Sequence, residues 1–251
     1  MAENPLLPNA ELRALRNLTR RCIALDAKGA RTRKAGGARN ALPGREALLA
    51  GTALQLKPGD LIIPERDDAT VAELAPADPH LAEGSTDILP AVSRQAPRLM
   101  LAAAMAAALR AAGTDRVVVV YLRERATEPD WDAALAWAQQ RQLPMILVCA
   151  DPRGPNAFQA DTRAAKTAFT WSSVNTTAHR LQLPVLTLDG EDAVAVYRAM
   201  QESLLRARGG GGPAILWGML TPAAEHAAGA WSGQPLRRLE QYMRARRIPL
   251  T

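Results

Sequence analysis

Residues Arg116 to Pro152 read RVVVVYLRERATEPDWDAALAWAQQRQLPMILVCADP, and this stretch decides the fold. It contains two short, continuous apolar runs, Val117–Leu122 and Met145–Cys149. Strands that are covered by helices on both faces have this composition, whereas half-exposed strands alternate apolar and polar residues. The two runs therefore predict buried, parallel strands of an α/β sheet.

The segment between these runs has the signals of a helix start. Thr127 is a candidate N-cap, Pro129 falls in the first turn, and Asp130 lies three residues after Thr127. The stretch is thus predicted to form a βαβ unit. Ligands in such sheets bind at the carboxyl ends of the strands, so the functional question falls on Leu122–Arg125 and Ala150–Pro152.

Strand and helix patterns alternate through the rest of the chain, which favours an α/β fold with a parallel sheet in a single domain. We divide it into an N-terminal helix and loop (1–42), a core (43–217) and a C-terminal loop and helix (218–251). The other expected strands are Leu61–Pro64, Pro184–Leu188 and Pro213–Trp217. The expected helices are Leu12–Leu25 with Asn9 as N-cap, Pro43–Leu56, Leu99–Ala112, Phe169–Leu181, Ala193–Arg208 and Pro235–Arg247, and Lys28–Asn40 is expected to be an exposed loop.

The amino-acid composition argues against several classes of function. The net charge is +6, but the basic residues are scattered and aromatic residues are only 4%, so we expect no nucleic-acid binding. The Ala-rich run Leu99–Leu109 is too short to span a bilayer, and we expect a soluble, cytoplasmic protein without membrane contact. Cys22 and Cys149 have no metal-ligand spacing and are expected to be buried hydrophobes.

Several motifs carry a family resemblance. They are Gly44 with Glu46 and Ala47, the step Lys57–Asp60, the Gln95 and Pro97 pair, and the turn Asp189–Asp192 followed by AVYRAM. Together they resemble the alpha subunit of thiamine-diphosphate-dependent 2-oxo-acid dehydrogenases, the decarboxylating first component of the pyruvate and branched-chain complexes. The resemblance extends from about Leu12 to Ile248, and it implies a three-layer thiamine-diphosphate-binding fold.

The resemblance also implies a cofactor site, from which this sequence departs. In the family, the first strand ends in G-D-G and the next in an acidic-Asn-Asn step, and the Asp and an Asn hold the magnesium that grips the diphosphate. Here the corresponding positions are Leu122, Arg123 and Glu124, and then Ala150–Pro152. Magnesium requires oxygen ligands, so a guanidinium at position 123 is repulsive and cannot coordinate it.

Two further parts of the family's site differ as well. Leu89 stands where the family has its active-site histidine, and His80 and His226 are expected to lie in exposed loops. The family's Tyr-Arg pair that contacts cofactor phosphate is represented only by Arg66, next to acidic residues that are expected to pair with it.

The candidate cofactor-binding residues are therefore Arg66, Arg123 and Arg125. One interpretation is that Arg123, Glu124 and Arg125 form a solvated, charged turn. The other is an anion site remodelled around Arg123 and Arg125. No other motif in the sequence offers replacement chemistry.

We accordingly expect a degenerate homologue with a structural or regulatory role, inactive as an isolated chain, with no cofactor of its own. Thiamine diphosphate and magnesium are implied by the resemblance only. The alternative is an active decarboxylating oxidoreductase subunit that acts on a 2-oxo acid with a beta-type partner and a remodelled pocket.

A homo-oligomer or a beta-type dehydrogenase subunit is the expected partner. The apolar stripes of Leu99–Leu109 and Leu12–Leu25 are the expected contact surfaces, because exposed stripes of this size are unusual on monomers. The alternative is that both stripes pack inside the domain.

Overall fold

The computed structural model describes residues 7–32, 42, 44–65, 70, 74, 97–123, 126–127, 130–152, 168–222 and 234–250. Its centre is a sheet of five strands in the order β1-β2-β4-β7-β6, in which every neighbouring pair is parallel. The strands are β1 (Leu61–Ile63), β2 (Val118–Arg123), β4 (Met145–Asp151), β6 (Val185–Asp189) and β7 (Ala214–Met219). The predicted α/β fold with a parallel sheet is confirmed.

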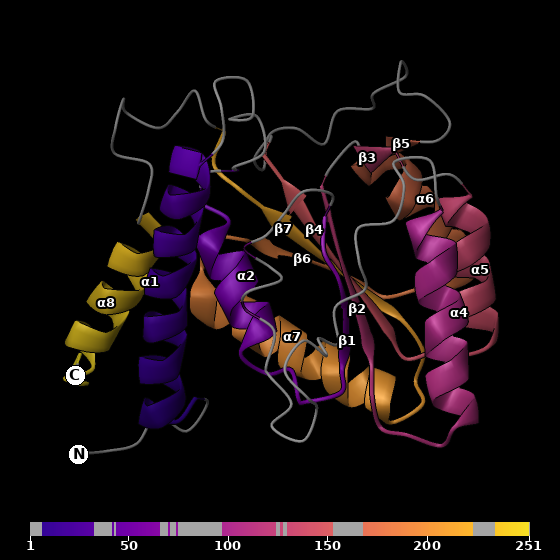
Figure 1. Cartoon of the computed structure of the whole chain (residues 1–251), viewed down its shortest axis with the longest axis horizontal. Coiled ribbons are helices and arrows are strands. Elements are labelled where there is room, and N and C mark those ends of the chain that lie inside the picture. Colours follow the sequence, from indigo (N-terminus) through magenta and orange to yellow (C-terminus); the bar gives the residue numbers. More distant parts are fainter. Residues whose placement is uncertain are drawn as a thin grey trace.

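Helices cover both faces of this sheet, so the chain has three layers (Figure 1). One face carries α1 (Asn9–Thr32), α2 (Glu46–Ala53), α7 (Ala193–Arg208) and α8 (Gln234–Ala245), and the other carries α4 (Arg98–Ala111), α5 (Trp131–Gln140) and α6 (Trp171–Leu181). Strand β2 explains why the sequence shows a continuous apolar run. Val119 and Tyr121 belong to the core under the first group of helices, and Val118 and Val120 belong to the core under the second.

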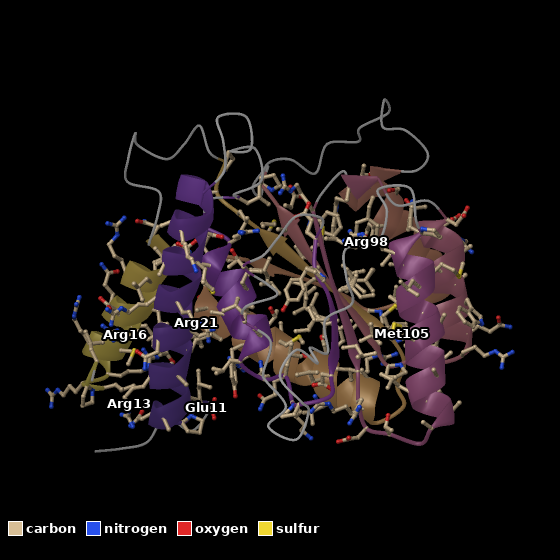
Figure 2. All side chains as sticks on the ribbon, in the orientation of Figure 1. Glu11, Arg13, Arg16, Arg21, Arg98 and Met105 are labelled. Carbon is tan, nitrogen blue, oxygen red and sulfur yellow. The ribbon has the colours of Figure 1, made fainter. Side chains whose placement is uncertain are left out.

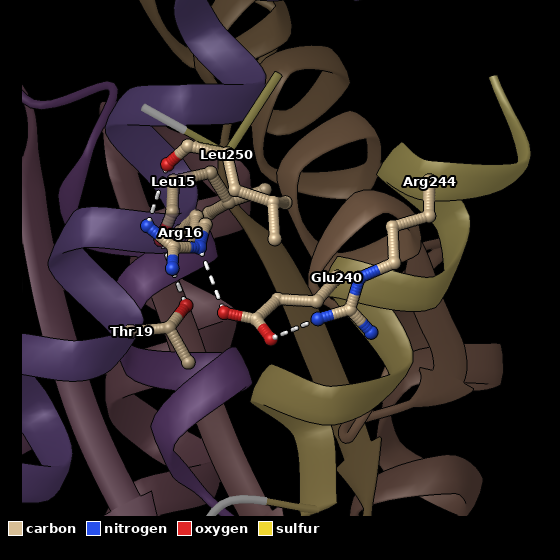
Figure 3. A network of polar contacts seen from close by, with 6 residues as sticks. All are labelled: Leu15, Arg16, Thr19, Glu240, Arg244 and Leu250. Carbon is tan, nitrogen blue, oxygen red and sulfur yellow. Dashed lines mark hydrogen bonds and ion pairs between the residues drawn. The ribbon is translucent and has the colours of Figure 1, made fainter. Parts of the chain in front are cut away.

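Helices α1 and α8 are tied together by a polar network (Figure 3). The Arg16 guanidinium donates from Nε to Glu240 Oε1 at 2.8 Å and from Nη1 to the Leu250 carbonyl at 2.8 Å. Arg244 reaches the other oxygen of Glu240 at 3.3 Å. The first and last described helices are therefore joined on one side of the molecule. Figure 2 labels Arg13, Arg16 and Arg21 along α1.

The Gly44, Glu46 and Ala47 motif lies at the start of α2. Arg45, the residue between Gly44 and Glu46, has a structural role. Arg45 is almost fully buried, and its Nη2 lies 2.6 Å from Asp26 Oδ1 on α1. Thr70 Oγ1 donates to the same oxygen at 2.6 Å. Because a buried cation requires a paired anion, this contact fixes α2 against α1.

The Lys57–Asp60 step organises the opposite, amino-terminal edge of the sheet. Asp60 accepts hydrogen bonds from the backbone N–H of Lys57 at 2.8 Å and of Val117 at 3.0 Å, and from Arg208 Nη2 at 2.5 Å. Burial nevertheless raises the pKa of this carboxyl above its ordinary value. Asp60 thus joins the end of α2, the start of β2 and the end of α7.

The prediction that Thr127 caps a helix is wrong. Thr127 lies in β3 (Ala126–Thr127), which pairs antiparallel with β5 (Ala168–Phe169), and α5 begins at Trp131 after Asp130 in a left-handed conformation. Pairing with a segment about 40 residues away outweighs the local cap signal. For the same reason, Phe169 is a strand residue, and α6 begins after a capping box formed by Thr170 and Ser173.

The expectation of a loop at residues 28–40 needs correction at its start. Helix α1 continues to Thr32, so residues 28–32 are helical, since each added residue gains a backbone hydrogen bond. The apolar stripes of α1 and α4 lie against the chain's own core. Leu12, Leu15 and Leu99 are buried there, whereas Met105 and Leu109 are partly buried.

Cys22 and Cys149 are both buried and free, as expected. Among the described helices, none combines the length and the apolar character that a membrane span requires.

Candidate functional site

The carboxyl ends of the parallel strands meet at one edge of the sheet. In register, Arg123 of β2 lies beside Ala150 of β4, and Asp151 of β4 lies beside Met219 of β7. Open α/β sheets bind ligands at this edge, so the chemistry of the site is decided by the side chains found there.

Arg123 forms an ion pair with Glu65, which follows β1. The Arg123 Nε atom lies 3.1 Å from Glu65 Oε1, although it is not aligned for a hydrogen bond, and Nη2 donates to Oε2 at 3.4 Å. The two side chains are only 22% and 19% exposed. Arg123 therefore ends a strand, and its charge is balanced by a partly buried carboxylate; Glu124 and Arg125 of the expected turn lie outside the described residues.

Arg98, at the start of α4, is a second cation near the same place, and sequence reasoning missed it. The residue is 2% exposed, and its Nη1 donates to the Pro64 carbonyl at 2.6 Å. Figure 2 labels Arg98 on α4. A cation at a helix N-terminus is opposed by the helix dipole, so it needs specific compensating contacts. An arginine directly after the helix-starting Pro97 was the signal in the sequence.

The carboxylate at the end of β4 has a structural partner. Asp151 is 1% exposed and accepts a hydrogen bond from the indole Nε1 of Trp217 on β7 at 3.0 Å. The Trp217 ring stacks on Phe169 with 5.8 Å between centroids and meets Trp171 edge-on at 5.2 Å. Asp151 is thus held inside an aromatic cluster that includes β5 and α6.

The end of β6 carries further carboxylates, and each has a described partner. Asp189 Oδ2 accepts from Arg238 Nη2 of α8 at 2.8 Å, and this hydrogen bond raises the pKa of Arg238. Glu191 is buried and accepts from the Thr221 backbone N–H at 2.7 Å. Asp192 caps α7 by accepting from the N–H groups of its first turn.

Of the three candidate residues, the structure places only Arg123. Arg66 and Arg125 lie outside the described residues, as do Leu89, His80 and His226. The structure brings Arg123 together with Glu65, and it brings Arg98 to the adjacent Pro64. At the ends of β1 and β2, the described part of the site therefore holds two arginines and one carboxylate, whereas the ends of β4 and β6 carry carboxylates with other partners.

These residues do not fit a magnesium–diphosphate site of the family's kind. Magnesium requires near-octahedral oxygen ligands. Glu65 faces a guanidinium and Asp151 faces an indole N–H, so neither carboxylate is presented as a free ligand. Within the described segments, no three His, Cys, Asp or Glu side chains gather as a metal site.

The comparison with protein families matches residues 80–221 to the family described as dehydrogenase E1 component. The chain belongs to this family. The matched region includes β2, β4 and β7, and hence Arg123, Asp151 and Trp217, while Glu65 lies before it.

Solved structures with the same fold include a thiamin diphosphate-dependent enzyme isolated from Mycobacterium smegmatis, with a TM-score of 0.50 and 15% identity over 73% of this chain. Benzoylformate decarboxylase from Polynucleobacter necessarius has a TM-score of 0.49 and 13% identity over 76%. This chain covers only 33% and 35% of those two proteins. At this identity, the first likeness shows the fold alone, which is that of a thiamine-diphosphate-binding domain.

Proposed function

We propose that this member of the dehydrogenase E1 component family has lost autonomous, magnesium-dependent binding of thiamine diphosphate and acts as a structural or regulatory subunit. The observation that carries the proposal is the Glu65–Arg123 ion pair at the end of β2. The resemblance implies a metal-ligating aspartate at position 123, and the pair puts a cation there instead.

Electrostatics supports this proposal. A magnesium ion at the end of β2 would lie next to a guanidinium, and it would have to compete with Arg123 for the Glu65 carboxylate. Removing Glu65 from the pair would leave Arg123 as a partly buried charge without that partner, which is costly. At the neighbouring strand end, using Asp151 as a ligand would break its hydrogen bond to Trp217.

A second candidate function is supported by the two guanidinium groups near Pro64 and Glu65. Arg98 and Arg123 approach this segment from α4 and β2 respectively. Guanidinium groups bind phosphate oxygens in bidentate geometry without a metal. A subunit of this kind would bind the diphosphate through arginines, together with a beta-type partner, and would take part in oxidative decarboxylation of a 2-oxo acid.

A thermal-shift experiment separates the two candidates. The chain and its Arg123→Gln variant are heated with thiamine diphosphate, with and without magnesium, and with a chelator. If the chain has lost autonomous binding, its thermal unfolding midpoint should be the same under every condition. Metal-free binding predicts a rise without magnesium that Arg123→Gln removes. A rise that requires magnesium and disappears with the chelator would contradict both candidates.

A further inference from the structure

Strand β6 and helix α7 form a second surface, at the side edge of the sheet. Strand β6 is the last strand in the sheet order, so within the described residues one of its sides has no neighbouring strand. Helix α7 lies against β6, and its Leu205 is 71% exposed, the one large hydrophobic side chain in the described part of the chain with such exposure. Unpaired strand edges and exposed large apolar side chains both favour association.

A groove of about 510 Å³ runs along this side. Its lining consists of Leu186 of β6 and six residues of α7, namely Ala195, Arg198, Ala199, Gln201, Glu202 and Leu205. The described residues provide no ion-pair partner for Arg198 or Glu202. On α7, the groove thus combines one protruding leucine, two alanines, one glutamine and one charge of each sign.

The order of these residues along α7 makes the surface complementary to itself. Ala195 and Leu205 lie five positions on either side of Met200, and Arg198 and Glu202 lie two positions on either side. A second α7 that runs antiparallel across the first at Met200 brings Leu205 to the partner's Ala195 and Arg198 to the partner's Glu202. At 1.5 Å per residue, the outer contacts lie roughly 7.5 Å from the axis.

We propose that the chain forms a symmetric homodimer through the outer face of α7, with the β6 edge beside it. A twofold axis makes every contact twice, so the interface gains two leucine-on-alanine contacts and two ion pairs. Ala199 and Gln201 lie one position on either side of Met200, so each alanine next to the axis faces the partner's glutamine, and this pairing of a small with a larger side chain is compatible with the 8–10 Å separation at which helices pack. We infer a second copy of the chain as the partner because one twofold rotation matches a large side chain with a small one and a cation with an anion. The interface uses no residue of the strand-end site and does not depend on the proposed function.

Light scattering after size exclusion tests the proposal over a range of concentrations. The wild-type chain is expected at twice its 26.9 kDa mass. Leu205→Arg is expected to weaken the dimer at least about tenfold, because a charge replaces the leucine in both apolar contacts. Arg198→Glu and Glu202→Arg each place like charges together and should also weaken it. The double variant restores opposite charges and should regain most of the affinity.

Arg20→Glu, on the exposed side of α1, is the matched control and should leave the dimer unchanged. Circular dichroism of each variant verifies folding, which these exposed positions should not affect. A wild-type monomer at every concentration overturns the proposal. A dimer that tolerates Leu205→Arg, or a double variant no better than the single charge reversals, overturns it as well.

Discussion

Arg123, the last residue of β2, is paired with Glu65, the second residue after β1, with 3.1 Å between Nε and Oε1. The pair joins the ends of two adjacent parallel strands. It occupies the part of the sheet where the resemblance to 2-oxo-acid dehydrogenases implies a metal-bound diphosphate. At this edge, the described ends of β1 and β2 are joined by a contact within the chain.

The first prediction concerns the strength of this pair. Glu65→Ala and Arg123→Ala should each lower the free energy of unfolding by about 1–2 kcal/mol, and the double variant should lose less than the sum by about 1 kcal/mol, because the charges are mostly buried and interact. Urea denaturation of the four proteins measures the coupling. The Lys57–Asp115 pair, whose side chains are 59% and 71% exposed, is the control and should show no measurable coupling. Additive losses at Glu65 and Arg123 would refute the prediction.

The second prediction concerns Gly44, which begins the family-like motif before α2. Its φ is +81°, and a Cβ atom placed there would lie 2.7 Å from Glu191 Oε1. Gly44→Ala should therefore lower the free energy of unfolding by roughly 2–3 kcal/mol, from backbone strain and the clash together.

Gly113 provides the matched control for Gly44. Its φ is +66°, but a Cβ atom would meet nothing within 4 Å. Gly113→Ala should cost only the strain, about 1 kcal/mol. Equal losses at the two positions would show that Glu191 does not restrict Gly44.

The third prediction concerns Cys22, whose thiol interacts electrostatically with Arg45 and Asp26. Burial raises the pKa of its thiol strongly, and nearby Asp26 and Glu46 add to the effect. The folded chain therefore keeps this proton where the unfolded chain releases it, above about pH 8.5. Since the unfolded state then binds fewer protons, the free energy of unfolding should fall as pH rises from 8.5 to 10.

Cys22→Ala removes this titration, so its unfolding free energy should depend less on pH in the same range. Denaturation of both proteins at pH 8 and pH 10 supplies the comparison. Parallel pH profiles would argue against a buried, neutral thiol at position 22.

The sequence predicted the sheet well because its strands are continuous apolar runs. Val117–Leu122 and Met145–Cys149 became β2 and β4 within one or two residues. Thr127 was assigned wrongly because its structure is decided by pairing with Ala168, which no local pattern reveals.

The candidate site was only partly predictable. Arg123 could be predicted as a site residue because it follows an expected strand. Its partner Glu65 is 58 residues away in the sequence, and the parallel pairing of β1 and β2 brings the two residues together. Arg98 and Trp217 were missed because each resembles an ordinary residue of its element. Their roles arise from tertiary contacts with Pro64 and Asp151.

Calorimetric titration of thiamine diphosphate into the purified chain in the presence of magnesium tests the central claim most directly. Because Arg123 and Glu65 neutralise each other where the metal would be held, we predict no heat of binding at chain concentrations that reveal dissociation constants up to tens of micromolar. Micromolar binding that disappears when a chelator removes the magnesium would contradict the account.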